Sequence, residues 1–113
     1  MFIKGVMKEF ELEIILELLR RTSNRVSRFL EEIESYEQEI YFSHVGYFLT
    51  LKNINLPKQR IVLDKPQITG KLGGIDVGFL VIIQDHQLTL ECYSYDNEIT
   101  EKNRNNGFEK TKT

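Results

Sequence analysis

The side chains that could carry out catalytic chemistry are few and widely spaced. The two histidines, His44 and His86, have no partner at the i, i+4 helical spacing that brings two metal ligands together. His86 falls in a predicted hairpin turn, where an exposed polar residue is expected, and His44 alternates with apolar residues in a predicted strand. General acid or base catalysis also needs a second group within hydrogen-bond reach. We therefore interpret both histidines as structural, and we expect no metal site and no catalytic residue.

Cys92 and the glycines do not predict a reactive or cofactor-binding site either. Cys92 is the only cysteine, so it cannot form a disulfide within the chain, and nothing indicates an oxidising compartment. It lies on the inward face of a predicted strand without a flanking Lys or Arg, which is typical of a buried, unreactive side chain. Gly70, Gly73 and Gly74 lack the strand-to-helix context of a phosphate-binding loop, so we expect turns and no cofactor.

Acidic side chains gather in two groups in the N-terminal third of the chain, with arginines between them. The acidic residues are Glu9, Glu11, Glu13, Glu17, Glu31, Glu32, Glu34, Glu37 and Glu39, and the arginines are Arg20, Arg21, Arg25 and Arg28. This alternation is typical of a solvated, internally compensated surface, although the carboxylates would also suit a basic partner. The net charge of −2 disfavours a broad nucleic-acid interface.

Length and composition place the chain among ordinary soluble domains. It has 113 residues, of which 41% are hydrophobic and 28% are charged, so one globular domain is expected. The N-terminus carries Lys4 and Lys8 without an apolar signal region, and translation from Met1 or Met7 would suit this pattern. The longest apolar run, Val77 to Ile83, is far short of the ~20 residues that span a bilayer. We expect a cytoplasmic protein without membrane contact.

The N-terminal third predicts helix. Lys8 to Tyr36 contains no Gly or Pro, and apolar side chains recur there at helical spacing. These apolar residues are Leu12, Ile15, Leu16, Leu19, Val26, Phe29, Leu30 and Ile33. The polar residues Thr22 to Asn24 interrupt the pattern, so the segment is either one long helix or two helices, and we favour a break near Ser23.

Later residues predict a sheet. Tyr41 to Leu51 is rich in aromatic and β-branched residues and predicts strand structure bent at Gly46. After a loop at Asn53 to Gln59, a short strand from Arg60 to Leu63 is expected to end at Asp64-Lys65-Pro66, and Gln67 to Leu72 is a weaker strand candidate.

A hairpin is the clearest predicted element. Ile75 to Ile83 and Leu88 to Tyr95 flank a polar tetrapeptide, and a two-residue loop at Asp85-His86 would fix their register. The expected inward pairs are Ile83 with Leu88, Val81 with Leu90, Phe79 with Cys92 and Val77 with Ser94. The expected outward pairs are Ile82 with Thr89, Leu80 with Glu91, Gly78 with Tyr93 and Asp76 with Tyr95.

Residues after Asp96 are mostly polar, and Ile99 and Phe108 are the only sizeable apolar groups among them. Such a segment buries too little apolar surface to offset its chain entropy, so we expect residues 97–113 to form a polar, flexible tail. We predict that residues 1–96 form a single α+β domain, in which an N-terminal helical segment packs on a mainly antiparallel sheet that ends in a β-hairpin.

The hairpin sequence Gly73-Gly74-Ile75-Asp76-Val77-Gly78-Phe79-Leu80-Val81-Ile82-Ile83, closed by Leu88-Thr89-Leu90-Glu91-Cys92-Tyr93-Ser94-Tyr95, resembles the terminal hairpin of small bacterial immunity proteins. These proteins are encoded beside polymorphic or contact-dependent growth inhibition toxins. The resemblance covers about a fifth of the chain and extends more weakly to Phe42 to Thr50. It implies a protein that binds and neutralises a cognate toxin domain, a nuclease among the candidates. The alternative function is a small ligand-binding regulator or an enzyme that uses His44 with nearby Tyr or Glu side chains.

The family shares no universal binding motif, so the partner-binding residues are chosen from the hairpin itself. We expect the partner at the outward face and end of the hairpin, on Asp76, Glu91, Tyr93, Tyr95 and Asp96. Tyrosines offer large, rigid contact areas, and the carboxylates would supply charge complementarity. In the competing interpretation helix packing buries this face, because Leu80 and Ile82 point the same way. If substitutions on this face left partner affinity and the thermal transition unchanged, we would expect the interface at Glu31 to Glu39.

Overall fold

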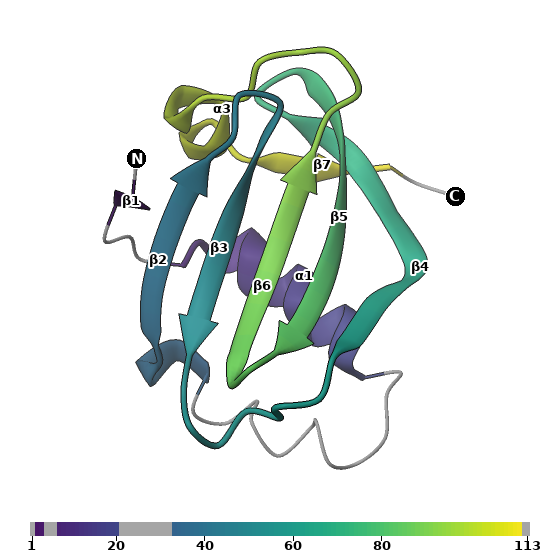
Figure 1. The fold of residues 1–113 in the computed structure, drawn as a ribbon. Helices are drawn as coiled ribbons and strands as arrows, with labels where there is room; N and C mark the ends of the chain where they lie inside the picture. Colours follow the sequence, from purple (N-terminus) through teal and green to yellow (C-terminus); the bar gives the residue numbers. More distant parts are fainter. Residues whose placement is uncertain (1, 4–6, 21–32, 112–113) are drawn as a thin grey trace.

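The elements of the chain form one sheet and a helix packed on it. The computed structural model describes residues 2–3, 7–20 and 33–111. The elements are β1 (Phe2–Ile3), α1 (Glu9–Leu19), the 3₁₀ helix η1 (Ile33–Ser35), β2 (Glu37–Phe42), β3 (Gly46–Lys52), β4 (Ile61–Leu72), β5 (Ile75–Gln84), β6 (Gln87–Tyr93), α3 (Glu101–Asn105) and β7 (Phe108–Lys110). All strand pairs are antiparallel, in the order β1-β2-β3-β6-β5-β4-β7 (Figure 1). The predicted α+β class, with an N-terminal helix on a mainly antiparallel sheet, is confirmed.

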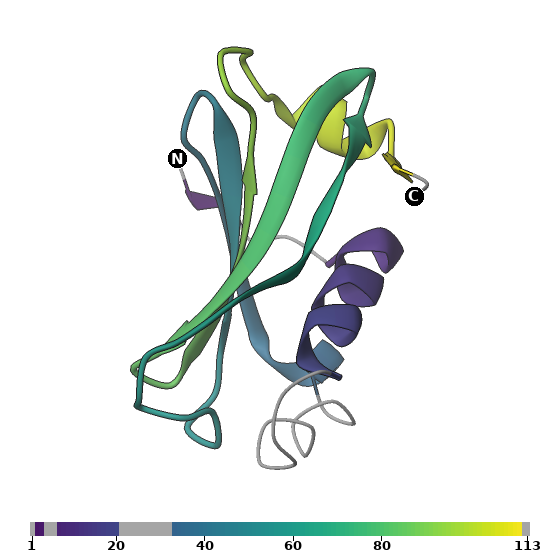
Figure 2. The same cartoon turned by 90° about the vertical axis from the view of Figure 1, so that its right-hand side faces the viewer.

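Helix α1 lies against one face of the curled sheet (Figure 2). Its buried apolar residues are Ile14, Ile15, Leu18 and Leu19, which follow helical spacing. The predicted break near Ser23 lies outside the described residues. At 11 residues α1 is the longest described helix, and no helix in the described ranges is long and apolar enough to cross a membrane.

The core lies between α1 and the inner face of the sheet. Inward residues of the three central strands β3, β5 and β6 alternate with outward ones, as the period of two along a strand requires. The buried inward residues are Tyr47, Leu49, Leu51, Val77, Phe79, Val81, Ile83, Leu88, Leu90 and Cys92. The opposite, outer face of these strands therefore carries Leu80 and Ile82, together with polar side chains of the neighbouring strands.

The predicted register of the hairpin is confirmed from Ile83↔Leu88 to Gly78↔Tyr93. Asp85 and His86 both have positive φ, at 51° and 63°, as the type I′ turn of a two-residue hairpin loop requires. The two further pairs expected beyond Tyr93 are not part of the ladder. Strand β6 ends at Tyr93, and the backbone N–H of Ser94 donates to the carbonyl of Val45, just before β3, at 2.8 Å.

Strand β4 differs from its prediction, because it continues through Asp64-Lys65-Pro66 as one strand with a register shift between Leu63 and Ile68. Its neighbour β7 pairs only with Gly70 to Leu72. The first part of β4 therefore lies at the edge of the sheet, where a proline interrupts no ladder on its free side.

The segment expected to be a loose tail instead contains α3 and β7. Ile99 is buried, Arg104 is buried, and β7 adds a strand beside β4. Phe108 packs edge-on against the ring of Phe79 at 5.0 Å between centroids. These long-range contacts compensate the entropy that a polar segment cannot offset by itself. The sheet consequently does not end with the β5–β6 hairpin.

Candidate partner-binding surface

The outer face of the sheet, opposite α1, carries half-exposed apolar and aromatic side chains. We define it by Tyr41, Phe48, Thr50, Val62, Leu80, Ile82, Thr89, Glu91 and Tyr93, which alternate with core residues along β2 to β6. Tyr41 is 39% exposed and Val62 is 46% exposed. Helix α1 packs on the other face, so it does not bury Leu80 and Ile82 (Figure 2).

Glu91 lies at the centre of this outer face. Its neighbours across the ladders are Phe48 on β3 and Leu80 on β5. Burial against these side chains raises the pKa of the Glu91 carboxyl. Lys52 and Lys71 lie on the same side of the sheet by register, and both are already paired, Lys52 with Glu39 at 3.2 Å and Lys71 with Asp76 at 2.9 Å. Among the described residues, none forms an ion pair or hydrogen bond with the Glu91 carboxylate, so its charge has no local counterion.

Tyr93 and Tyr95 form an aromatic corner beside Glu91. The ring of Tyr93 lies over Gly78, where an added Cβ would come within 2.5 Å of the ring. The two tyrosine rings are nearly perpendicular, at 83°, with centroids 6.4 Å apart. Tyr95 is 84% exposed. Only a residue without a side chain at position 78 permits this approach, so the predicted ring-over-glycine contact is confirmed.

Four of the five predicted partner-binding residues lie at one end of the outer face, and Glu91 lies nearer its centre. Asp76, Tyr93 and Tyr95 line the same shallow pocket, and Glu91 precedes Tyr93 by two residues on the same face of β6. Asp96 is exposed just beyond that strand, where its carboxylate accepts a hydrogen bond from the Asn97 side chain at 3.2 Å. The structure therefore brings three of these residues together and leaves Glu91 and Asp96 beside them.

The histidines and Cys92 form no site in the described part of the chain. His44 lies in the turn between β2 and β3 with φ 82°, rather than within a strand as predicted, and it is exposed. His86 Nδ1 lies 2.7 Å from the carbonyl oxygen of Leu56, a contact that holds the hairpin turn against the preceding loop. Burial raises the pKa of the Cys92 thiol, so the reactive thiolate is disfavoured. No group of three potential metal ligands occurs among the described residues.

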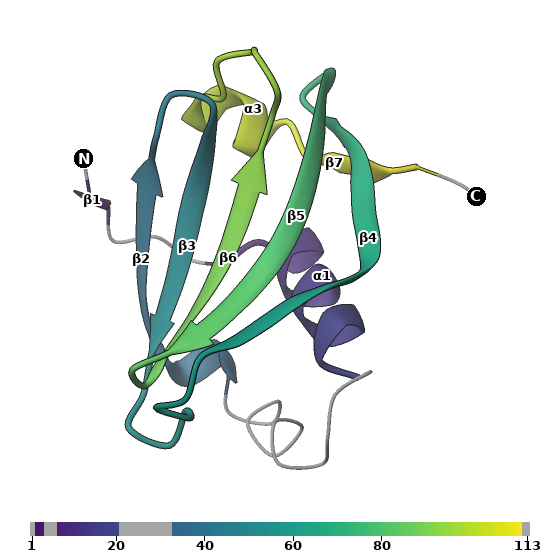
Figure 3. The same cartoon turned by 45° about the vertical axis from the view of Figure 1, so that its right-hand side comes forward.

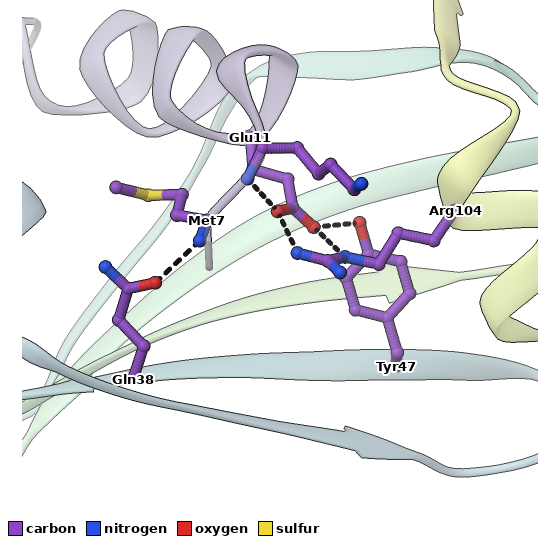
Figure 4. Close-up of polar contacts among 6 residues, drawn as sticks. Met7, Glu11, Gln38, Tyr47 and Arg104 are labelled. Carbon is purple, nitrogen blue, oxygen red and sulfur yellow. Dashed lines mark hydrogen bonds and ion pairs between the residues drawn. The ribbon is translucent and has the colours of Figure 1, made fainter. Parts of the chain in front are cut away.

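A buried polar cluster joins α1, β3 and α3, and the sequence analysis did not predict it (Figure 4). Glu11, expected on the solvated surface, is a fully buried residue of α1, and its carboxylate accepts hydrogen bonds from Arg104 Nη2 at 2.7 Å and Arg104 Nε at 2.9 Å. Tyr47 Oη donates to the same carboxylate at 2.6 Å, and the backbone N–H of Lys8 donates at 2.7 Å. Glu11 lies three, four and seven residues before buried apolar positions of α1, a spacing that could have revealed its inward direction.

Electrostatics within this buried cluster favour the ion pair. Burial raises the pKa of Tyr47, and the charge of Glu11 raises it further, so the phenol stays a donor. Burial alone would lower the pKa of Arg104, but hydrogen bonding and the charge of Glu11 outweigh it and raise that pKa. The Arg104 guanidinium also lies 5.8 Å from the centroid of the Tyr47 ring. Because all three side chains are shielded from solvent, we interpret the cluster as an anchor of the C-terminal segment rather than a catalytic site.

Comparisons of the chain with protein-family models, with curated proteins and with solved structures gave no match.

Proposed function

We propose that this protein binds another protein through the outer face of its sheet, and that it acts in the cytoplasm as an immunity protein that neutralises a cognate toxin domain. The observation that carries the proposal is the difference between the two faces of the sheet. One face packs against α1, while the other presents aromatic, apolar and acidic side chains. The hairpin resemblance supplies the class of partner.

The size and chemistry of the outer face suit a protein partner. The chain exposes 7123 Å², of which a standard interface of about 800 Å² per partner would occupy roughly a ninth. Exposed tyrosines such as Tyr95 are typical of interface centres, and the uncompensated Glu91 would attract a basic partner. If the toxin is a nuclease, Glu91 and the other acidic side chains at this face would complement the basic groove that otherwise holds phosphates.

The proposal predicts that a toxin domain is encoded beside this gene, and coexpression with that domain tests it. The wild-type chain should rescue growth and copurify with the toxin. Glu91→Lys combined with Tyr95→Ala should weaken binding by about 2 kcal/mol, or about thirtyfold, while leaving a native thermal transition.

Glu13→Lys is the control, because Glu13 is an exposed acid on α1, away from the outer face. This variant should bind as the wild type does. Failure of the wild-type chain to rescue growth or copurify would refute the immunity function. Wild-type affinity of the double variant, with a native transition, would remove the outer face as the interface.

A further inference from the structure

A small pocket opens at the end of the outer face where β6 stops. It lies beside β4 and β5, which run next to each other there (Figure 3), and it has a volume of about 220 Å³. Its lining residues are Thr69, Gly70, Asp76, Val77, Gly78, Tyr93, Tyr95 and Thr111. Sites for small molecules and cofactors are typically ~300–1,000 Å³, so this pocket suits a single side chain better.

The walls of the pocket combine an aromatic corner with a carboxylate. The nearly perpendicular rings of Tyr93 and Tyr95 both line the pocket, and the π-face of an aromatic ring attracts cations through its negative quadrupole. Asp76 lines the same pocket from β5. Its Oδ1 accepts from Lys71 Nζ at 2.9 Å, but both side chains are mostly exposed, so an incoming cation can share or replace this pair at little cost.

The charges around the pocket also favour a cationic ligand. Glu91 lies on the same outer face, two residues before Tyr93, and its carboxylate has no ion-pair partner among the described residues. Phosphate and carboxylate ligands are disfavoured beside the acidic side chains of Asp76 and Glu91. A planar cation, by contrast, can stack on tyrosine while it donates hydrogen bonds to a carboxylate. Guanidinium meets both requirements, and it is less strongly hydrated than an ammonium group.

We propose that this pocket receives an arginine side chain of the protein partner, which stacks on the Tyr93–Tyr95 corner and donates hydrogen bonds to Asp76. The identity of the partner rests on the proposed function above, but the chemistry of the pocket does not. Arginine recognition would place one fixed contact at the rim of the outer face, while Phe48, Leu80 and Ile82 supply apolar area.

A blocked arginine, N-acetyl-arginine methylamide, tests the pocket directly. Titrated at tens of millimolar and constant ionic strength, it should shift the NMR signals of Gly78 and Tyr95 in a saturable way. The neutral isostere N-acetyl-citrulline methylamide should bind at least tenfold more weakly. Tyr95→Ala and Asp76→Asn, both at exposed positions, should each weaken arginine binding at least fivefold without changing the thermal transition.

Equal binding of the arginine and citrulline probes, or arginine shifts that survive both substitutions, would overturn the proposal. This result is separable from the test of the immunity function. Toxin neutralisation without arginine binding would remove the pocket assignment alone. Arginine binding without toxin neutralisation would support the pocket and remove the immunity assignment.

Discussion

The buried pair of Glu11 and Arg104 gives the sharpest test of the fold. Arg104→Met keeps most of the length of the side chain but leaves the Glu11 carboxylate without its counterion. Removing one partner of a buried pair costs about 3–5 kcal/mol. Two donors to the carboxylate remain, from Tyr47 and from the backbone of Lys8, so we expect a loss of about 3 kcal/mol. Against a typical total of 5–15 kcal/mol, that is a large share of the stability.

Urea denaturation at pH 7, followed by circular dichroism, measures this loss. Lys110→Met is the matched control, because Lys110 also joins the C-terminal segment to α1, through an exposed ion pair with Glu17 at 2.9 Å. An exposed pair contributes roughly 0–1 kcal/mol, so this control should unfold close to the wild type. Equal losses for the two variants, or a loss below about 1 kcal/mol for Arg104→Met, would refute the burial argument.

A double substitution separates charge from packing in the same assay. Glu11→Leu combined with Arg104→Met removes both charges and fills the site with apolar groups. Replacing a buried ion pair in this way is often neutral or stabilising. The double variant should therefore be more stable than Arg104→Met alone. If it is less stable, the loss comes from packing of the arginine stem rather than from the uncompensated Glu11.

Three further outcomes follow from the outer face and the core. Burial raises the folded-state pKa of Glu91, so ionisation of this carboxyl lowers the stability of the fold as pH rises through that pKa. Glu91→Gln should therefore raise the melting temperature at pH 7. This gain should vanish below the unfolded-state pKa of about 4.3, where the carboxyl is protonated in both states. Gly78→Ala should displace the Tyr93 ring and reduce binding of the blocked arginine, because the new Cβ would lie 2.5 Å from ring atoms. Cys92 should react with a thiol reagent only as fast as the native protein opens, because its thiol is buried and its pKa is raised; rapid labelling of the folded protein would contradict this.

The features that could be predicted from the sequence are local. The β5–β6 register follows from a two-residue turn and the alternation on both sides of it, so a wrong register would have moved Phe79 and Cys92 to the outer face. The contact of Tyr93 with Gly78 follows from the same register. The strand through Pro66 was harder to predict, because a proline is compatible with a strand only at an edge, and position in the sheet depends on distant elements.

The buried anchor depends on contacts that no local pattern contains. Glu11 and Arg104 are separated by 93 residues, and each by itself is typical of a solvated surface. The segment around Arg104 contains too few apolar groups to predict α3 and β7. Nothing in the local sequence indicates that Arg104 itself is buried. A polar segment can thus become part of the fold when one buried ion pair and a short strand hold it in place.

This anchor also bears on the candidate pocket. After Arg104, β7 pairs with β4, and the backbone N–H of Thr111 donates to the carbonyl of Thr69 at 2.8 Å. Both threonines line the pocket beside Tyr95. The buried ion pair on the inner face and the proposed arginine site on the outer face are therefore linked through the C-terminal strand. Because Asp76 and Tyr93 belong to the hairpin, that strand completes the pocket without supplying its charge or its aromatic corner.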